Sequence, residues 1–269
     1  LNSDNYAAAE EIVSQNFVPT TIDQQILQDH DPDYRVFNNA GDFASEGRTS
    51  YFHKSIGGYH PAKLSIYQDL LDKYFTQNLE QNVLNMLNVK YIVNTNPQTN
   101  QQQLGPNPFA FGPAWLVKYV RLVDGPVAEI QDIGTTHLRD TAIVQQRFAG
   151  AVVQPRFDST ATIRLAHFDN DTMKYACHAS QPQFAVFSEI YYPLGWNAYI
   201  DGKKVAYTKA DYVLRGLSIP AGQHEVVFIF EPATYKKGVT IAYIASFLIL
   251  LSLIGGLFYS WWISRKPVT

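Results

Sequence analysis

The segment Val239–Ile263 reads VTIAYIASFLILLSLIGGLFYSWWI and contains no charged residue. As a helix rising about 1.5 Å per residue it would be roughly 37 Å long, which exceeds a bilayer hydrocarbon core of about 30 Å. Tyr259, Trp261 and Trp262 lie near its end, and such side chains favour the membrane interface. The segment therefore predicts a transmembrane helix. The alternative is a helix buried in a soluble core, where uncharged runs of this length are rare.

The charges beside this segment do not fix its orientation in the membrane. Lys236 and Lys237 precede it, and Arg265 and Lys266 follow it. The count of basic residues, which usually marks the cytoplasmic side, is therefore tied.

The composition indicates a folded protein and excludes some classes of function. The 269 residues are 46% hydrophobic and 17% charged, which suits a large core and argues against a disordered chain. The net charge of -3, with no basic block, argues against a nucleic-acid partner. Cys177 is the only cysteine, so the chain forms no internal disulfide and no paired-cysteine zinc site.

The region before residue 114 has a mixed helix and strand pattern. Tyr34–Phe37 is extended, and a helix is predicted to open at Pro61 and to continue to Phe75 with its apolar residues on one face. A shorter helix over Val83–Leu87 leads into a strand at Val89–Val93. Asn94–Pro113 is rich in Asn, Gln, Pro and Gly and predicts a long surface loop.

Short alternating strands separated by turn residues dominate the region after residue 151 and predict a β-sandwich. The predicted strands are Ala161–His167, Thr172–Ala179, Phe184–Tyr191, Trp196–Ile200, Lys203–Tyr207, Tyr212–Ile219 and His224–Phe230, and a further pair is expected at Ala114–Val123 and Ala142–Gln146. Asp201-Gly202 is typical of a type I′ hairpin turn.

We therefore expect an α+β fold in four parts. Residues 1–150 form a mixed α/β subdomain, and residues 151–238 form an antiparallel, jelly-roll-like β-sandwich. Residues 239–263 form the transmembrane helix, and residues 264–269 form a short tail.

The densest cluster of polar side chains is RTSYFHKSIGGYHPAK, Arg48–Lys63. A basic, hydroxyl-rich loop that runs straight into a helix start presents free N–H groups and the positive end of a helix dipole, which suit a phosphate or a sugar phosphate. The candidate binding residues are Arg48, His53, Lys54, Gly57, Gly58, Tyr59, His60 and Lys63. The alternative is a simple glycine turn with solvated lysines.

Two other groups of residues are weaker candidates. Asp29, Asp31 and Asp33 surround His30, but the spacing lacks the glycine turn and distal Glu of a calcium loop, and no metal site is predicted. Aromatic residues in the sandwich can stack on sugars but belong more often to a core. They are Tyr191, Tyr192, Trp196 and Tyr199.

Three long strings resemble the YfhO family of bacterial integral membrane proteins: Tyr51–Phe75, Asn82–Val93 and Phe187–Pro232. The resemblance implies a polytopic glycosyltransferase of the GT-C class, which takes a sugar from a polyprenyl-phosphate carrier on the outer face of the cytoplasmic membrane. In that class the catalytic carboxylate lies on the first outer loop, which the resemblance places upstream of Leu1. No catalytic residue is therefore assigned, and residues 1–269 alone are expected to be inactive.

The resemblance also implies a location and partners. Residues 1–238 are expected on the extracytoplasmic side of a bacterial cytoplasmic membrane. The expected partners are a polyprenyl-phosphate-linked sugar, a cell-envelope glycan acceptor, the bilayer and further transmembrane helices upstream. No cofactor is identified, and a divalent cation would belong to the upstream catalytic region. The alternative function is a non-catalytic, membrane-anchored carbohydrate-binding or assembly module.

Overall fold

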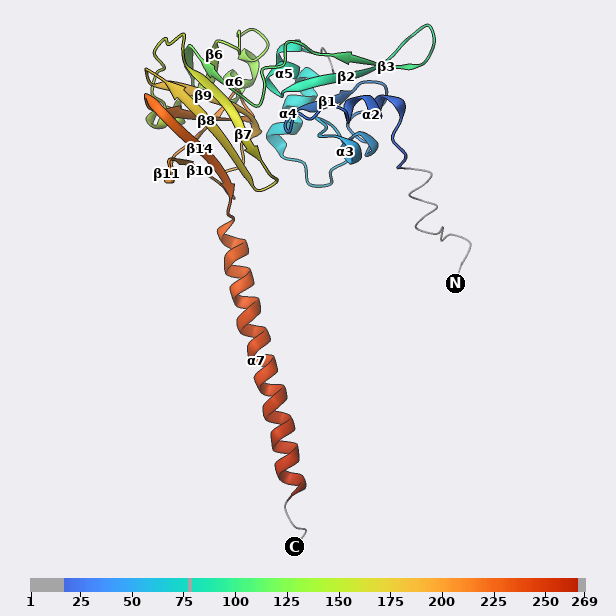
Figure 1. The fold of residues 1–269 in the computed structure, drawn as a ribbon, viewed down its shortest axis with the longest axis vertical. Helices are drawn as coiled ribbons and strands as arrows, with labels where there is room; N and C mark the ends of the chain where they lie inside the picture. The colour runs from blue at the N-terminus through green and yellow to red at the C-terminus, as the bar shows by residue number, and fades with distance from the viewer. Residues whose placement is uncertain (1–16, 77–78, 266–269) are drawn as a thin grey trace.

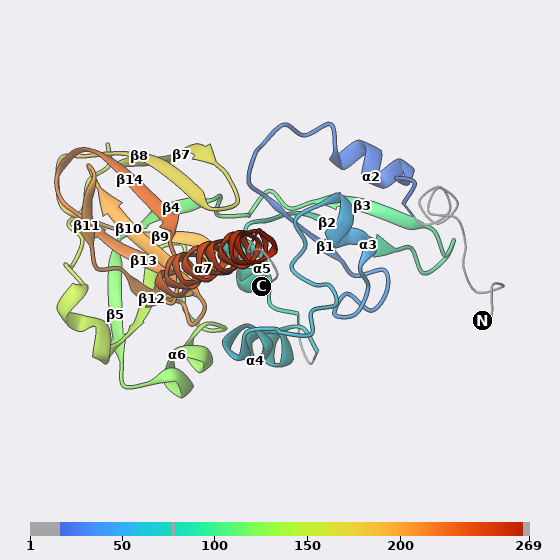
Figure 2. The same cartoon turned by 90° about the horizontal axis from the view of Figure 1, so that it is seen from below.

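The computed structural model describes residues 17–76 and 79–265. Three β-sheets form a body, and one long helix leads away from it (Figure 1). Seen from below, the three-stranded sheet lies on one side of the body and the two larger sheets lie on the other (Figure 2). Residues 1–16, 77–78 and 266–269, which include Lys266 and most of the expected tail, lie outside the described residues.

The three-stranded sheet and four short helices form the N-terminal part of the body. Its strands are β1 (Arg35–Asn38), β2 (Val89–Thr95) and β3 (Gln102–Pro106), in the order β1-β2-β3, with β1 and β2 parallel. The helices are α2 (Thr21–Ile26), α3 (Arg48–Phe52), α4 (Ser65–Tyr74) and α5 (Gln81–Met86). The predicted strand at Val89–Val93 and the helix before it are confirmed.

Two predictions for this region are wrong. The helix predicted to open at Pro61 begins at Ser65, because the backbone at its N-cap, Leu64, is still extended. The predicted loop Asn94–Pro113 contains β3, which pairs with β2 as an antiparallel hairpin. Its turn is closed by the Asn96 N–H, which donates to the Gln101 carbonyl at 2.8 Å. Asn-rich sequence here forms a hairpin turn and not an irregular loop.

The sandwich consists of a five-stranded and a six-stranded sheet. The five-stranded sheet has the order β11-β10-β14-β8-β7, and the six-stranded sheet has the order β4-β9-β13-β12-β6-β5. The strands are β4 (Ala114–Val117), β5 (Tyr119–Val123), β6 (Thr141–Gln145), β7 (Thr162–Phe168), β8 (Thr172–Ala179), β9 (Gln183–Ile190), β10 (Trp196–Ile200), β11 (Lys203–Val205), β12 (Thr208–Ala210), β13 (Leu214–Ile219) and β14 (Gly222–Phe230). Helix α6 (Pro126–Asp132) links β5 to β6, which are parallel.

All seven strands predicted after residue 151 are present. Asp201 and Gly202 have φ angles of 50° and 75°, the positive values that a type I′ turn requires at both positions. The six-stranded sheet also contains β4, β5 and β6, so the expected boundary between residues 150 and 151 runs through this sheet.

Two hydrophobic clusters hold the body together. Tyr175, Phe187 and Phe228 pack between the sandwich sheets, and Phe187 contacts both other rings at centroid distances of 4.8 and 4.9 Å. A larger cluster joins Phe37 of β1 to Phe184 of β9 and to the helices between them. The small sheet and the sandwich therefore share a core.

Helix α7 (Ala233–Ser264) is confirmed as a membrane-spanning candidate. Its mean hydropathy reaches 2.4 over the most apolar stretch, and none of that stretch is buried in the structure. This exposure shows that α7 is not a core helix of the described body. Only Glu231 and Pro232 separate β14 from α7, and the Glu231 N–H donates to the Gly195 carbonyl at 2.7 Å.

Candidate functional site

One end of the five-stranded sheet lies beside the start of α7. The Phe230 N–H at the end of β14 donates to the Asp171 carbonyl at 2.8 Å, so the turn between β7 and β8 lies next to the chain that enters α7. Figure 1 shows this turn at the lower edge of the body, the side from which α7 leaves. We call this the proximal end of the sandwich, and Phe168, the last residue of β7, lies there.

A pocket of about 490 Å³ adjoins the proximal end. Phe168 forms part of its wall, and four of the residues predicted from sequence line it: His53, Lys54, Gly57 and His60. We call it the proximal pocket.

A second pocket of about 690 Å³ borders α3. It is lined by Arg48, Tyr59 and His60 among the predicted residues, so His60 belongs to both pockets. Gly58 and Lys63 line neither of the two. The structure thus brings six of the eight candidates to two adjoining pockets.

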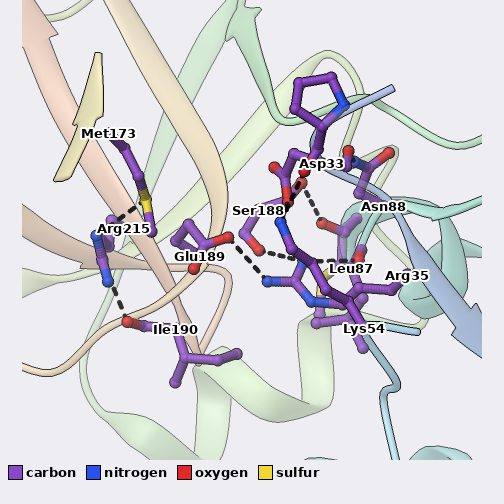
Figure 3. Close-up of polar contacts among 12 residues, drawn as sticks. Asp33, Arg35, Lys54, Leu87, Asn88, Met173, Ser188, Glu189, Ile190 and Arg215 are labelled. Carbon is purple, nitrogen blue, oxygen red and sulfur yellow. Dashed lines mark hydrogen bonds and ion pairs between the residues drawn. The ribbon is translucent and has the colours of Figure 1, made fainter. Parts of the chain in front are cut away.

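The charge of Lys54 is already neutralised. Its ammonium lies 3.0 Å from Asp33 Oδ1 (Figure 3). It also donates to the Pro32 carbonyl at 2.9 Å and lies over the Phe168 ring. Asp33 is fully buried, and its Oδ2 has no partner among the described residues. The main role of Lys54 is therefore structural. It pairs with the buried Asp33 carboxylate and holds the loop that contains Lys54 against β7.

Arg48 and His53 also share a carboxylate. His53 Nε2 lies 3.1 Å from Asp23 Oδ1, and Arg48 lies 3.4 Å from Asp23 Oδ2. Burial acts to raise the pKa of Asp23, but hydrogen bonds from Thr20 and His53 outweigh it and hold the pKa below the usual value. Asp23 therefore stays ionised and fixes both side chains to the start of α2.

The two glycines have a structural role that the sequence did not specify. The Gly58 N–H donates to the Phe43 carbonyl at 2.7 Å, and a side chain on Gly57 would collide with that carbonyl. Gly58 has a φ of 107°, which favours glycine. Because α4 begins only at Ser65, the expected helix start directly behind this loop is wrong, and the N-terminus of α4 does not lie at the glycines.

His60, Lys63 and Tyr59 are the candidates without structural duties. Among the described residues, the side chains of His60 and Lys63 make no hydrogen bond or ion pair, although Lys63 lines neither pocket and its charge helps to lower the pKa of Asp42. Tyr59 is 72% exposed. These three side chains are therefore the ones available to a ligand.

A buried ion pair at the back of the proximal pocket was not predicted. Arg35 of β1 donates to Glu189 of β9 at 3.0 Å and to the carbonyls of Leu87 and Ser188 at 2.9 and 2.5 Å (Figure 3). Burial lowers the pKa of Arg35, but Glu189 and Asp33 more than offset it, so the net pKa is raised. The only signal in the sequence is a charged residue, Glu189, within the largely apolar strand FAVFSEI.

The other candidates have structural partners. Asp29 and Asp31 pair with Lys90 at 2.6 and 3.1 Å. Within residues 17–76 and 79–265, no cluster of His, Cys, Asp and Glu side chains is placed to hold a metal ion. Trp196 packs on Phe230, and Tyr199 donates to Glu231 at 2.8 Å.

Comparison with known proteins finds one family. Residues 142–242 match the sequence model of the family described as bacterial membrane protein YfhO, a stretch that runs from β6 to the first turns of α7. This confirms the resemblance over the sandwich, and the strings Tyr51–Phe75 and Asn82–Val93 lie outside the matched residues. No curated protein and no solved structure matches the chain.

Proposed function

We propose, from the match of residues 142–242 to the YfhO family of bacterial membrane proteins, that this chain is part of a multi-pass GT-C glycosyltransferase. It comprises the extracytoplasmic body and a terminal membrane helix. The enzyme transfers a sugar from a polyprenyl-phosphate donor to a cell-envelope glycan, and its catalytic base lies outside residues 1–269.

The position of the proximal pocket is the observation that carries this proposal. The pocket is lined by Phe168, at the same sheet end where the chain passes from Phe230 into α7. The phosphate of a polyprenyl carrier lies at the membrane surface, because the lipid chain is held in the hydrocarbon core. A pocket at the proximal end is therefore placed to meet this phosphate and its sugar.

The unpartnered side chains have the chemistry that this reaction needs. When the anomeric carbon is displaced, the carrier leaves as a phosphate monoester and gains negative charge. His60, which lines the proximal pocket, donates a hydrogen bond to that phosphate, and the positive charge of Lys63, three residues further along the chain, acts on it from outside the pocket lining. Tyr59, in the adjoining pocket beside α3, offers a phenol for the sugar. Lys54 acts indirectly, since its ammonium is held by Asp33.

The test uses the full-length protein in membranes, with transfer of a labelled sugar from its polyprenyl phosphate as the readout. We expect His60→Ala and Lys63→Ala each to lower the transfer rate by about tenfold or more. His30→Ala is the matched control, because His30 is exposed and lines neither pocket. Unchanged transfer in both variants, with normal membrane insertion, would remove this loop from the reaction.

A further inference from the structure

The outer face of the five-stranded sheet carries a polar slot that is separate from the proximal pocket. The pairing of β7, β8 and β14 places side chains in two rows across the three strands: Thr162–His178–Gln223 and Arg164–Ala176–Glu225. All six residues are exposed and line a pocket of about 460 Å³. We call this pocket the sheet slot.

The small side chain of Ala176 forms the floor of the slot. Arg164 and Glu225 flank Ala176 on the two neighbouring strands, and adjacent strands lie about 4.8 Å apart. The two charged residues are therefore separated by roughly 10 Å, with only a methyl group between them. This gap is wide enough for one sugar ring lying on the sheet.

The polar side chains that surround the floor of the slot have no bonding partners among the described residues. Within the described part of the chain, the side chains of Arg164, His178, Gln223 and Glu225 make no hydrogen bond or ion pair. The charged residues near the proximal pocket are different, because Arg35 and Lys54 are bound to Glu189 and Asp33. Donors and acceptors on opposite walls of an otherwise unpartnered slot point to a ligand.

We propose that the sheet slot binds a neutral sugar unit of a glycan chain. The Arg164 guanidinium can only donate hydrogen bonds and the Glu225 carboxylate accepts them, so the ligand must accept on one side and donate on the other. Sugar hydroxyls do both. Glu225 would repel a phosphate or carboxylate, and Arg164 would repel a cation. The opposed charges therefore give a simple anion or cation no net advantage, whereas an uncharged polyhydroxy ligand can hydrogen-bond to both walls.

The distance of the slot from the proximal end of the sandwich indicates that its ligand is a glycan chain and not the lipid-linked donor. Glu225 lies five residues before Phe230 on β14, which is roughly 17 Å along the strand from the proximal end. A glycan of several units held in the slot can extend towards the proximal pocket. The slot would then hold the acceptor, and this assignment to the acceptor rests on the proposed function.

Binding is tested on the full chain in lipid nanodiscs, because common detergents carry sugar headgroups. The probes are maltotetraose, laminaritetraose and chitotetraose, measured by calorimetry. We expect at least one probe to bind, and Arg164→Ala and Glu225→Ala each to weaken its binding about tenfold or more. Ala176→Leu fills the floor without touching the core and should abolish binding.

The matched control is Lys174→Ala, because Lys174 lies on β8 next to the slot but does not line it. Binding should be unchanged in this variant. The proposal is overturned if no probe binds, if Ala176→Leu binds as the wild type does, or if glycerol phosphate binds more tightly than the neutral glycans. Circular dichroism of each variant checks that the sandwich is folded.

The two proposals fail in different ways. If the slot binds a glycan but the full-length protein transfers no sugar, glycan binding by the slot is supported and the proposed glycosyltransferase function is refuted. If transfer proceeds in Ala176→Leu with an unchanged KM for the acceptor, the slot has no part in acceptor binding, while the transferase function stands.

Discussion

The ion pair between Arg35 and Glu189 is predicted to hold the small sheet to the sandwich. Their side chains are 13% and 14% exposed, and Arg35 also donates to two backbone carbonyls from other elements. Arg35→Ala removes the ion-pair partner of the buried Glu189, which typically costs about 3–5 kcal/mol, and the nearby Arg215 guanidinium, which also acts on Glu189, offsets part of this cost. For a body of this size we expect the melting temperature to fall by roughly 6–20 °C.

A double-mutant cycle separates the ion pair from the rest of this contact. Glu189→Ala should be similarly destabilising, because Arg35 loses its ion-pair partner and the buried Arg215 loses the same nearby charge. The double variant should be more stable than the sum of the two losses by up to about 2 kcal/mol, since neither member of the pair then remains without the other, although Arg215 still lacks the Glu189 charge. It should still be less stable than the wild type, because the carbonyls of Leu87 and Ser188 have lost a donor.

The assay is thermal unfolding of the body in nanodiscs, followed by tryptophan fluorescence. Lys118→Ala is the matched control, because it breaks an ion pair to Asp140 whose side chains are 54% and 36% exposed. Such a surface pair contributes less than about 1 kcal/mol. If Arg35→Ala costs no more than this control, or if the two losses simply add, the ion pair does not hold the small sheet to the sandwich.

Three further predictions concern other parts of the chain. Burial raises the pKa of Asp211 to about 8, so between about pH 4 and about pH 8 only the folded state keeps the proton. The free energy of unfolding should therefore fall as pH rises through this window, and Asp211→Asn, measured by urea unfolding, should remove that part of the dependence. Gly58→Ala should destabilise the body by more than about 1 kcal/mol, because its φ is 107° and the new methyl would meet the Ser50 hydroxyl. Gly112→Ala, with φ 88° and open space around it, should cost less in the same unfolding assay. Leu250→Lys places a charge within α7 and should reduce the fraction that resists alkaline extraction from membranes, at a cost of about 2.5–3.5 kcal/mol.

The strands of the sandwich could be predicted because their signals are local. Alternating apolar residues and turns such as Asp201-Gly202 specify a strand and its end without reference to distant residues. β12 was missed because Thr208–Ala210 is only three residues long. β3 was missed because a polar strand forms only through its pairing with β2, which a composition rich in Asn and Gln does not reveal.

Most residues that line the candidate site could be predicted from the sequence. The ion pairs that neutralise their charges could not. A cluster of basic residues in Arg48–Lys63 can be recognised in one short stretch. Their partners, Asp23 and Asp33, lie 21 to 30 positions away from Lys54 and His53, and nothing local signals that these carboxylates fold back onto the loop. The link between Arg35 and Glu189 spans 154 positions and depends on the tertiary fold alone.

The connection between β14 and α7 determines how the body moves with its membrane anchor. Glu231 is tied to Gly195 and Tyr199, and Pro232, with φ -65°, begins the helix directly. So short and stiff a joint leaves little freedom for the body to swivel on a tether. A rotation of α7 about its own axis would therefore rotate the whole sandwich. A change in the tilt of α7 against a neighbouring helix would likewise tilt the sandwich relative to the membrane. Helix packing inside the bilayer would thereby set which face of the body points along the membrane surface.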